Sequence, residues 1–266
     1  MAKEILYKTL FYKFNESLKM ISIIRSIIIW FFIFITIVFI APIFIVTWLL
    51  TFLFDRRLFV LSKVALFWGS LYTKLSPWWH VKVTGKEKIK KKGVYVVVAN
   101  HQSIEDILIM YRLGKPFRWV SKYEVFRIPV FGWLMNLSGD IKLKRTSKAS
   151  IKKMLIDGEK ALKKGCTLFI FPEGTRSRNG QMGNFKEGAF KLAQLSKRSI
   201  LPVIIQGTSD NLLTKYGIFN GSHTVKLKVL DEISYSQFQN MDTRELANYV
   251  KEIMANELNH LKTESA

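Results

Sequence analysis

The sequence contains a single cysteine, Cys166, among 266 residues. One thiol excludes an internal disulfide framework and zinc sites built from paired cysteines, and it fits a reducing, cytosol-facing location. Histidine is also scarce, because only His80, His101, His223 and His260 occur. We find neither the His and carboxylate spacing of a metal site nor a Gly-rich nucleotide loop, so no metal and no cofactor is expected. The side chains that could act as a general base are therefore few.

Acidic residues are scarce as well, since 20 Asp and Glu stand against 41 Lys and Arg for a formal net charge of +21. A chain this basic is expected to bind an anionic partner, either nucleic acid or a membrane surface that contains anionic lipid. Intrinsic disorder is excluded, because 49% of the residues are hydrophobic and 20 are Phe. The length allows one or two domains with a complete core.

Charge is absent altogether from Ser26 to Phe54, a run rich in Ile, Phe and Trp. A bilayer core needs about 20 apolar residues of helix, so we expect this run to be embedded in a membrane. Pro42 divides the run into two pieces that are each short for a span, and both flanks of the run are basic. These features predict a helical hairpin that enters from the cytoplasmic face of the cell membrane. A single tilted or kinked span is the alternative.

The next stretch, from Leu58 to Trp79, places apolar and aromatic residues at helical spacing with Lys63 and Lys74 between them. Such a helix fits the headgroup zone of a membrane, and an ordinary core helix is the alternative. We therefore expect residues 1–79 to form the membrane-embedded and interfacial part of the chain. Residues 80–266 are expected to form one soluble domain.

The soluble part alternates short apolar runs with amphipathic stretches. The runs that predict strands are Gly93–Ala99, Thr167–Phe171, Ile200–Ile205 and the more exposed His223–Val229. Helices are expected from Ser103, where Ser103 and Asp106 match a capping box, over Ser150–Lys164, over Asn184–Leu195 and from Asp242. This alternation predicts an α/β fold, a mostly parallel sheet flanked by helices. In such sheets the active site lies beyond the carboxyl ends of the strands.

The residues after the first predicted strand include a histidine and a carboxylate that could act together. His101 precedes the predicted helix and Asp106 lies in its first turn, so the loop-to-helix transition can bring the carboxylate to the imidazole. This pair suits general-base catalysis, in which His101 takes a proton from an attacking hydroxyl and Asp106 stabilises the imidazolium. Alternatively, Asp106 only completes the capping box. Glu105 is expected to be a solvated first-turn residue.

Cationic side chains follow the second predicted strand and precede the helix at 150. In the turn Phe171-Pro-Glu-Gly-Thr-Arg-Ser177, Arg176 could bind a phosphate, and Glu173 could hold a glycerol hydroxyl or orient Arg176. The alternative is a surface turn with an internal ion pair. Arg145 is the side chain of the basic run 142–153 that we single out as a phosphate ligand. A second cluster, Lys86, Lys88, Lys90, Lys91 and Lys92, is assigned to a membrane-facing or solvated surface.

Five sequence blocks follow one another between residues 100 and 205. They are the His-x4-Asp spacing of His101 and Asp106, Val120–Trp133, Gly139-Asp-Ile-Lys-Leu-Lys-Arg145, Phe171-Pro-Glu-Gly-Thr-Arg176 and Ile200-Leu-Pro-Val-Ile-Ile205. In this order and spacing, the blocks resemble the 1-acyl-sn-glycerol-3-phosphate acyltransferase family over roughly residues 80–210. The family often has an acidic or small residue where this chain has Lys144, which leaves the acceptor headgroup open.

The resemblance implies transfer of an acyl chain from acyl-CoA or acyl carrier protein to the free sn-2 hydroxyl of a lysophospholipid, giving phosphatidic acid at the membrane. It implies that His101 is the base and Asp106 its partner. By position, the glycerol phosphate would be held by Arg145, Glu173, Gly174, Thr175 and Arg176, with Lys122 near the same anion.

Three other functions compete with this expectation. The acceptor could be another lysophospholipid, a lipidated amino acid or glycerol 3-phosphate. A membrane-tethered nucleic-acid-binding module would use the net charge, but the basic residues are not interleaved with aromatics on a recognisable platform, so no nucleic-acid partner is expected. A catalytically silent lipid-binding scaffold is opposed by the intact pair of His101 and Asp106.

Overall fold

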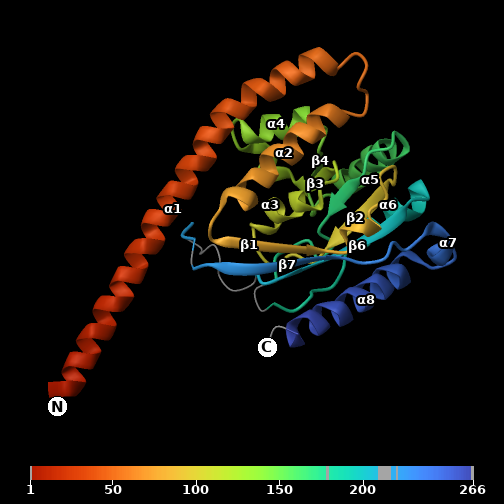
Figure 1. Ribbon diagram of the computed structural model, residues 1–266. Helices are drawn as coiled ribbons and strands as arrows, with labels where there is room; N and C mark the ends of the chain where they lie inside the picture. Colours follow the sequence, from red (N-terminus) through yellow and green to blue (C-terminus); the bar gives the residue numbers. More distant parts are fainter. Residues whose placement is uncertain (1, 178–179, 209–216, 220, 265–266) are drawn as a thin grey trace.

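The computed structural model describes residues 2–177, 180–208, 217–219 and 221–264, which form a seven-stranded sheet with its flanking helices and a long N-terminal helix beside them (Figure 1). The strands are β1 (Trp79–Thr84), β2 (Tyr95–Ala99), β3 (Arg118–Lys122), β4 (Ile141–Leu143), β5 (Leu168–Ile170), β6 (Ser199–Gln206) and β7 (His223–Val229). Their order is β1-β7-β6-β2-β5-β3-β4, and every neighbouring pair is parallel except β6 and β7. The prediction of an α/β fold with a mostly parallel sheet is confirmed.

Helices cover both faces of this sheet. They are α1 (Ala2–Thr51), α2 (Phe59–Leu75), α3 (Asp106–Met110), α4 (Phe131–Leu137), α5 (Lys148–Lys163), α6 (Gly188–Ser196), α7 (Tyr235–Phe238) and α8 (Thr243–Thr263), with 3-10 turns at Lys86–Lys88, Tyr111–Leu113 and Tyr123–Arg127. On one face, α5, α6 and α8 bury Leu162, Leu192 and Val250 against the strands. On the other face, α3 and α4 bury Ile109 and Met135. Successive residues of β2 point to alternate cores, so the continuous apolar run that predicted this strand reflects burial on both faces.

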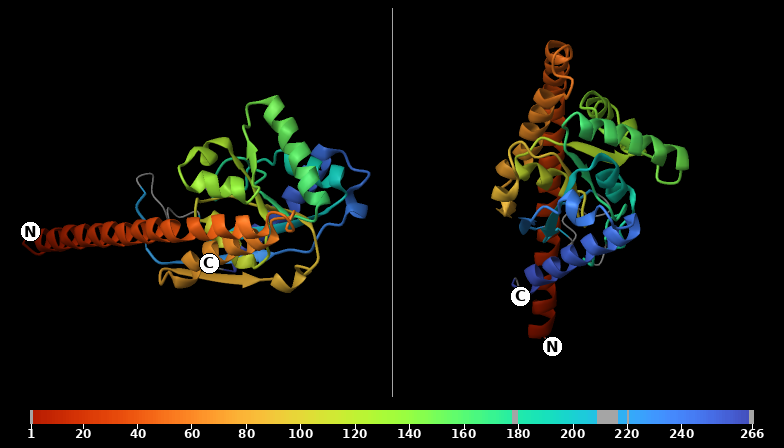
Figure 2. Two further views of the ribbon diagram at one scale, coloured as in Figure 1. Left: turned by 90° about the horizontal axis from the view of Figure 1, so that it is seen from above. Right: turned by 90° about the vertical axis from the view of Figure 1, so that its right-hand side faces the viewer.

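The N-terminal hairpin differs from the expected one. Pro42 lies inside α1, which continues to Thr51 as one helix, and Figures 1 and 2 show its N-terminal part projecting beyond the domain. A proline removes only one backbone donor, and a long helix bends at that point more readily than it ends. The prediction that Pro42 divides the run Ser26–Phe54 into two helices is therefore wrong. The hairpin is formed by α1 and α2, and the chain turns at Asp55, whose carboxylate accepts from the Val60 amide at 2.8 Å.

Helix α2 runs back along α1 and packs on it. Phe44 of α1 meets Trp68 edge to face at 6.3 Å between ring centroids, and Thr36 is hydrogen-bonded to Tyr72. The opposite side of α1 is apolar and exposed, as Phe31 and Phe39 illustrate at 64% and 67% exposure. The segment Lys19–Thr51 is long and apolar enough to cross a membrane, judged by length and composition.

Three side chains of α1 attach it to the soluble domain. Arg25 is buried and its Nε donates to the Phe219 carbonyl at 3.1 Å, while the Ser26 hydroxyl accepts from the Phe219 amide at 2.8 Å. One turn later, Trp30 Nε1 donates to the Gly217 carbonyl at 2.8 Å. These bonds join α1 to the segment that precedes β7, so the direction of the long helix is set relative to the sheet.

Strands β1, β3 and β4 were not predicted. β4 has only three residues, and β1 is half exposed with Lys82 in its middle, so neither produces a continuous apolar run. In contrast, the expected helix start at Asp242 is confirmed, because its side chain accepts from the Arg244 and Glu245 amides and Glu245 completes a capping box.

The chain leaves the carboxyl end of β2 through Asn100, whose carboxamide extends the pairing of β2 with β6 by one residue. Its Nδ2 donates to the Ile205 carbonyl and its Oδ1 accepts from the Ile205 amide, both at 2.8 Å. Asn100 is buried, so neither backbone group of Ile205 can use water instead. The side chain thereby fixes where the following loop begins.

We expect Asn100→Ala to lower the free energy of unfolding by about 2 kcal/mol, because two buried backbone groups lose their partner. Thermal unfolding in detergent would measure the change. Asn184→Ala is the matched control, since that side chain is exposed and accepts from Lys251, and its effect should stay within about 0.5 kcal/mol. Equal midpoints for both variants would contradict this assignment for Asn100.

Candidate active site

The site begins at the loop that follows Asn100, where His101 and Asp106 are in contact. Nδ1 of His101 lies 2.8 Å from Oδ2 of Asp106, and the same oxygen accepts from the amides of Gln102 at 2.7 Å and Ser103 at 2.9 Å. Asp106 is fully buried at the start of α3. A carboxylate held by two amides keeps the imidazole proton on Nδ1, which leaves Nε2 to accept a proton.

The capping box expected at Ser103 forms only in part. The Asp106 carboxylate does accept from the Ser103 amide, but the Ser103 hydroxyl is hydrogen-bonded to Glu105, and α3 begins only at Asp106. Glu105 is 1% exposed, so the expectation of a solvated residue is wrong. Burial raises the pKa of Glu105, and the Arg176 guanidinium acts in the opposite direction. The loop therefore turns a second carboxyl group inward beside Asp106.

The turn after β5 packs directly on the histidine loop. The ring of Phe171 stacks on His101 with 3.9 Å between centroids, and the Ser177 amide donates to the His101 carbonyl at 2.8 Å. Glu173 spans the gap between loops, because one carboxylate oxygen accepts from the His101 amide and the other from the Gly183 amide, each at 2.8 Å. Burial raises the pKa of Glu173, and these two donors lower it in part. The sequence offered a glycerol hydroxyl or Arg176 as its partner, whereas both oxygens here accept backbone amides.

The predicted phosphate ligands lie on neighbouring loops at the same edge of the sheet. Arg145 follows β4 and reaches the turn after β5, since a Cβ at Gly174 would lie 3.8 Å from Arg145 Nε. Thr175 and Arg176 are exposed on that turn. Within the described ranges, neither Arg145 nor Arg176 has a carboxylate at ion-pair distance, which leaves both guanidinium groups available to an anion.

Lys122 is set apart from this group. It ends β3 and is paired in register with Leu143, but its ammonium lies 3.7 Å from Glu124 on the exposed surface. Glu124 also acts on Arg145, where it opposes the lowering of the arginine pKa by desolvation. Lys122 therefore lies near the loop of Arg145, but its ammonium group already has Glu124 as an acidic neighbour.

Two apolar cavities, which the sequence did not reveal, adjoin α3. One of about 150 Å³ lies between α2, α4 and the sheet and includes Trp119 and Met135, and the other, of about 250 Å³, includes Phe32 and Trp78. Both reach Leu108, two residues beyond Asp106. Both cavities therefore offer apolar space beside α3 and beneath the hairpin. Across the residues with described positions, no group of three or more His, Cys, Asp or Glu could hold a metal ion.

Comparisons with known proteins agree on one family. A family model described as Acyltransferase matches residues 80–206. The chain is 37% identical over 159 residues to the chloroplastic 1-acyl-sn-glycerol-3-phosphate acyltransferase LPAT1 of Arabidopsis thaliana, covering 59% of this chain and 44% of that protein. It is 30% identical over 202 residues to the 1-acyl-sn-glycerol-3-phosphate acyltransferase of Escherichia coli, covering 74% of this chain and 81% of that protein.

A solved structure has the same fold over nearly the whole chain. The crystal structure of the 1-acyl-sn-glycerophosphate acyltransferase PlsC from Thermotoga maritima matches with a TM-score of 0.72 at 28% identity, covering 92% of this chain and 97% of that one. The chain spans about half the length of two chloroplastic relatives, 44% of the Arabidopsis thaliana protein and 49% of one from Brassica napus.

We expect Glu173→Gln to raise amide hydrogen exchange about tenfold at His101 or Gly183, because an amide side chain has one oxygen acceptor and the carboxylate has two. Exchange followed by mass spectrometry would measure it. The matched control is Glu187→Gln, since Glu187 is exposed at the start of α6 and makes no side-chain cap bond. Unchanged exchange at both amides would show that Glu173 does not hold the loops together.

Proposed function

The chain belongs to the 1-acyl-sn-glycerol-3-phosphate acyltransferase family, and from this we propose that it acylates the sn-2 hydroxyl of 1-acyl-sn-glycerol 3-phosphate to give phosphatidic acid. The acyl donor is a thioester, either acyl-CoA or acyl carrier protein. The observation that carries the proposal is the contact of His101 with the buried Asp106, at the same sheet edge as Arg145 and Arg176, which have no carboxylate partner among the described residues.

In the proposed mechanism, His101 is the general base. Its Nε2 accepts the proton of the sn-2 hydroxyl as the oxygen attacks the thioester carbonyl, and the buried Asp106 stabilises the imidazolium that forms. The new C–O bond forms, the C–S bond breaks, and the proton passes to the departing thiolate. A thioester is already activated, so this transfer needs no covalent enzyme intermediate.

The acceptor is proposed to bind through its phosphate. Arg145 and Arg176 are exposed on adjacent loops, so both can reach one anion, and an arginine binds phosphate through two parallel hydrogen bonds. Positive φ at Gly174, 75°, and its lack of a side chain let the turn pass close to Arg145. Lys122 and Thr175 would contribute at the rim of the same site, while Glu173 would act by holding the loops.

The hairpin explains how a domain of this kind could reach a lipid. We place α1 and the exposed side of α2 in the cell membrane, because their outward side chains are apolar. The soluble domain is proposed to lie on the cytoplasmic face of that membrane. The apolar cavities beneath α2 begin near α3, so an acyl chain could lie there while the phosphate stays at the membrane surface.

We expect His101→Ala to lower turnover by about 100-fold to 10,000-fold with an unchanged thermal midpoint, because a positioned base contributes about that much to rate. The assay would use lysophosphatidic acid in detergent or liposomes with labelled acyl-CoA and, separately, acyl carrier protein. The matched control is His260→Ala, which removes an exposed imidazole on α8. Full activity in a folded His101→Ala protein would eliminate the mechanism.

Arg176→Ala should raise the KM for lysophosphatidic acid about tenfold to hundredfold and leave kcat almost unchanged, because charge-assisted hydrogen bonds to phosphate are lost. The increase in KM should vanish with monoacylglycerol, an acceptor without phosphate. Arg244→Ala, which removes an exposed guanidinium from α8, is the control. A kcat effect without a KM effect would place the acceptor phosphate elsewhere.

The second candidate function is acyl transfer to another acceptor. The extra cation at Lys144, beside Arg145, favours a strongly anionic headgroup but does not choose among lysophospholipids, a lipidated amino acid and glycerol 3-phosphate. Competition among these acceptors in the same assay would decide, and a preference for any of them would keep the chemistry and change the substrate.

A further inference from the structure

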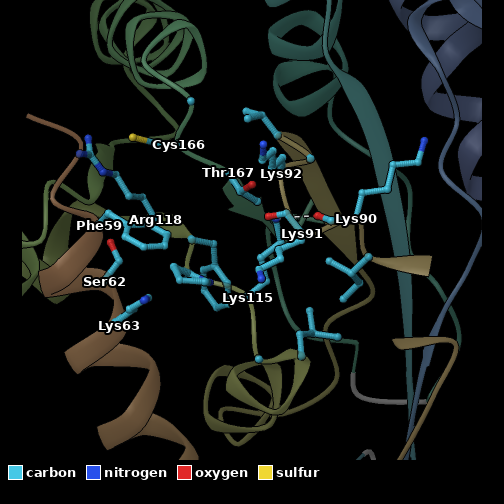
Figure 3. A pocket seen from close by; sticks show the side chains of 18 of the residues that line it. Phe59, Ser62, Lys63, Lys90, Lys91, Lys92, Lys115, Arg118, Cys166 and Thr167 are labelled. Carbon is cyan, nitrogen blue, oxygen red and sulfur yellow. Dashed lines mark hydrogen bonds between the residues drawn. The ribbon is translucent and has the colours of Figure 1, made fainter. Parts of the chain in front are cut away.

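The lysine cluster between residues 86 and 92 has no role in the proposed reaction, yet it forms part of a cavity. Figure 3 shows this cavity, of about 750 Å³, with Phe59, Ser62 and Lys63 of α2 on one side and Lys91 and Lys115 opposite them. The cationic side chains that line it are Arg57, Lys63, Lys86, Lys90, Lys91, Lys92, Lys115 and Arg118. No acidic residue is among the residues that line the cavity, and we call this cavity the amino-edge pocket.

The amino-edge pocket lies at the opposite edge of the sheet from His101. Its walls include Val94, Phe117 and Thr167, which directly precede β2, β3 and β5, whereas His101 follows β2. A strand rises about 3.3 Å per residue, so the five residues of β2 separate the two regions by roughly 17 Å. An anion in this pocket would therefore not be the acceptor in the active site.

The positive charge of the pocket is largely uncompensated. Of the eight cationic side chains, only Lys90 has a carboxylate partner within the described part of the chain, namely Glu232. Lys115 is partly withdrawn from water and donates to the carbonyls of Lys90 and Lys91, and desolvation lowers its pKa. Arg118 donates to the Arg57 carbonyl at 2.8 Å. A bound anion would relieve the mutual repulsion of the cations that line the pocket.

The position of the pocket identifies the anion. Arg57 lies in the turn between α1 and α2, three residues after Phe54, and Leu53 and Phe54 are 75% and 73% exposed. Phe59, at the rim, is 47% exposed. Cations beside exposed apolar side chains are typical of the level where lipid phosphates meet acyl chains. We propose that the amino-edge pocket binds the phosphate headgroup of an anionic membrane phospholipid.

Such a lipid would hold the second edge of the domain at the membrane. The hairpin alone attaches the domain along α1 and α2, about which it could tilt. A headgroup bound between α2 and the loops before β2 and β3 fixes the amino edge at the height of the lipid phosphates. The loops at the carboxyl edge are then held at the same height, where a lysophospholipid headgroup lies.

Binding of short-chain lipids to the full-length protein in neutral detergent tests the proposal without using turnover. The probes are dioctanoyl phosphatidylglycerol and dioctanoyl phosphatidylcholine, counted by native mass spectrometry. Wild type should bind the anionic lipid at least about tenfold more tightly than the zwitterionic one. The triple variant Lys86→Gln, Lys91→Gln and Lys92→Gln should weaken anionic binding about tenfold to hundredfold, while Arg at the same three positions should restore it.

The matched control removes the same charge elsewhere, through Lys148→Gln, Lys152→Gln and Lys191→Gln, which are exposed on α5 and α6. It should bind both lipids as wild type does. Equal weakening in both triple variants, or no preference for the anionic lipid in wild type, would overturn the proposal. So would inorganic phosphate that displaces the lipid at micromolar concentration, or a triple variant that loses only binding of acidic acyl carrier protein. Because binding is measured, a failure here is distinguishable from a failure of the proposed acyl transfer.

Discussion

The bidentate use of the Glu173 carboxylate is the contact on which the candidate site depends. Its two oxygens accept hydrogen bonds from the amides of His101 and Gly183. One side chain thus joins the loop after β2 to the start of the loop after β5, where Glu173 lies, and to Gly183 ten residues later. Phe171 then stacks on the imidazole and Ser177 donates to the His101 carbonyl. Neither loop has regular structure of its own at this point, and their relative position follows from these few bonds. Positioning of this kind accounts for a large part of enzymatic rate acceleration.

The Glu173 carboxylate is one of three buried carboxyl groups near His101. Glu105, Asp106 and Glu173 are all nearly inaccessible around His101, and burial raises the pKa of Glu105 and of Glu173. Oδ2 of Asp106 binds two amides and the imidazole, but its Oδ1, like Oε1 of Glu105, is buried and has no hydrogen-bond partner among the described residues. An imidazolium formed during proton transfer would face this cluster, and the positive charge would be stabilised there. Burial of these carboxyl groups lowers the free energy of unfolding, and the same burial would strengthen their attraction for a protonated His101.

Much of this could be predicted where local pattern determines the structure. The apolar runs of β2, β5 and β6 are buried on both faces, and the contact of His101 with Asp106 follows from a loop-to-helix transition of fixed length. The predicted break at Pro42 was wrong because a proline removes one hydrogen bond from a helix that the bonds of the neighbouring turns and the apolar surroundings sustain. Burial of Glu105 could not be predicted from its first-turn position, because α3 begins only at Asp106 and the loop before it turns the Glu105 side chain inward, where its carboxyl group is hydrogen-bonded to Ser103. Short strands such as β4 pair only because β3 offers a free edge.

The direction of the strands relates both edges of the domain to one surface. Helix α2 begins at Phe59, beside the loops that precede β2 and β3, and ends at Leu75, shortly before β1 starts at Trp79. Because β1 runs antiparallel to β2, that start lies toward the edge that carries His101. Helix α2 thus spans the sheet from its amino edge to its carboxyl edge, and α1 packs along it with apolar side chains outward. In the proposed arrangement, a membrane that holds α1 would meet both edges at the same level, with the cations of the amino-edge pocket at the first and His101 at the second. The positive charge of that pocket would then favour an orientation in which the sheet lies along an anionic surface.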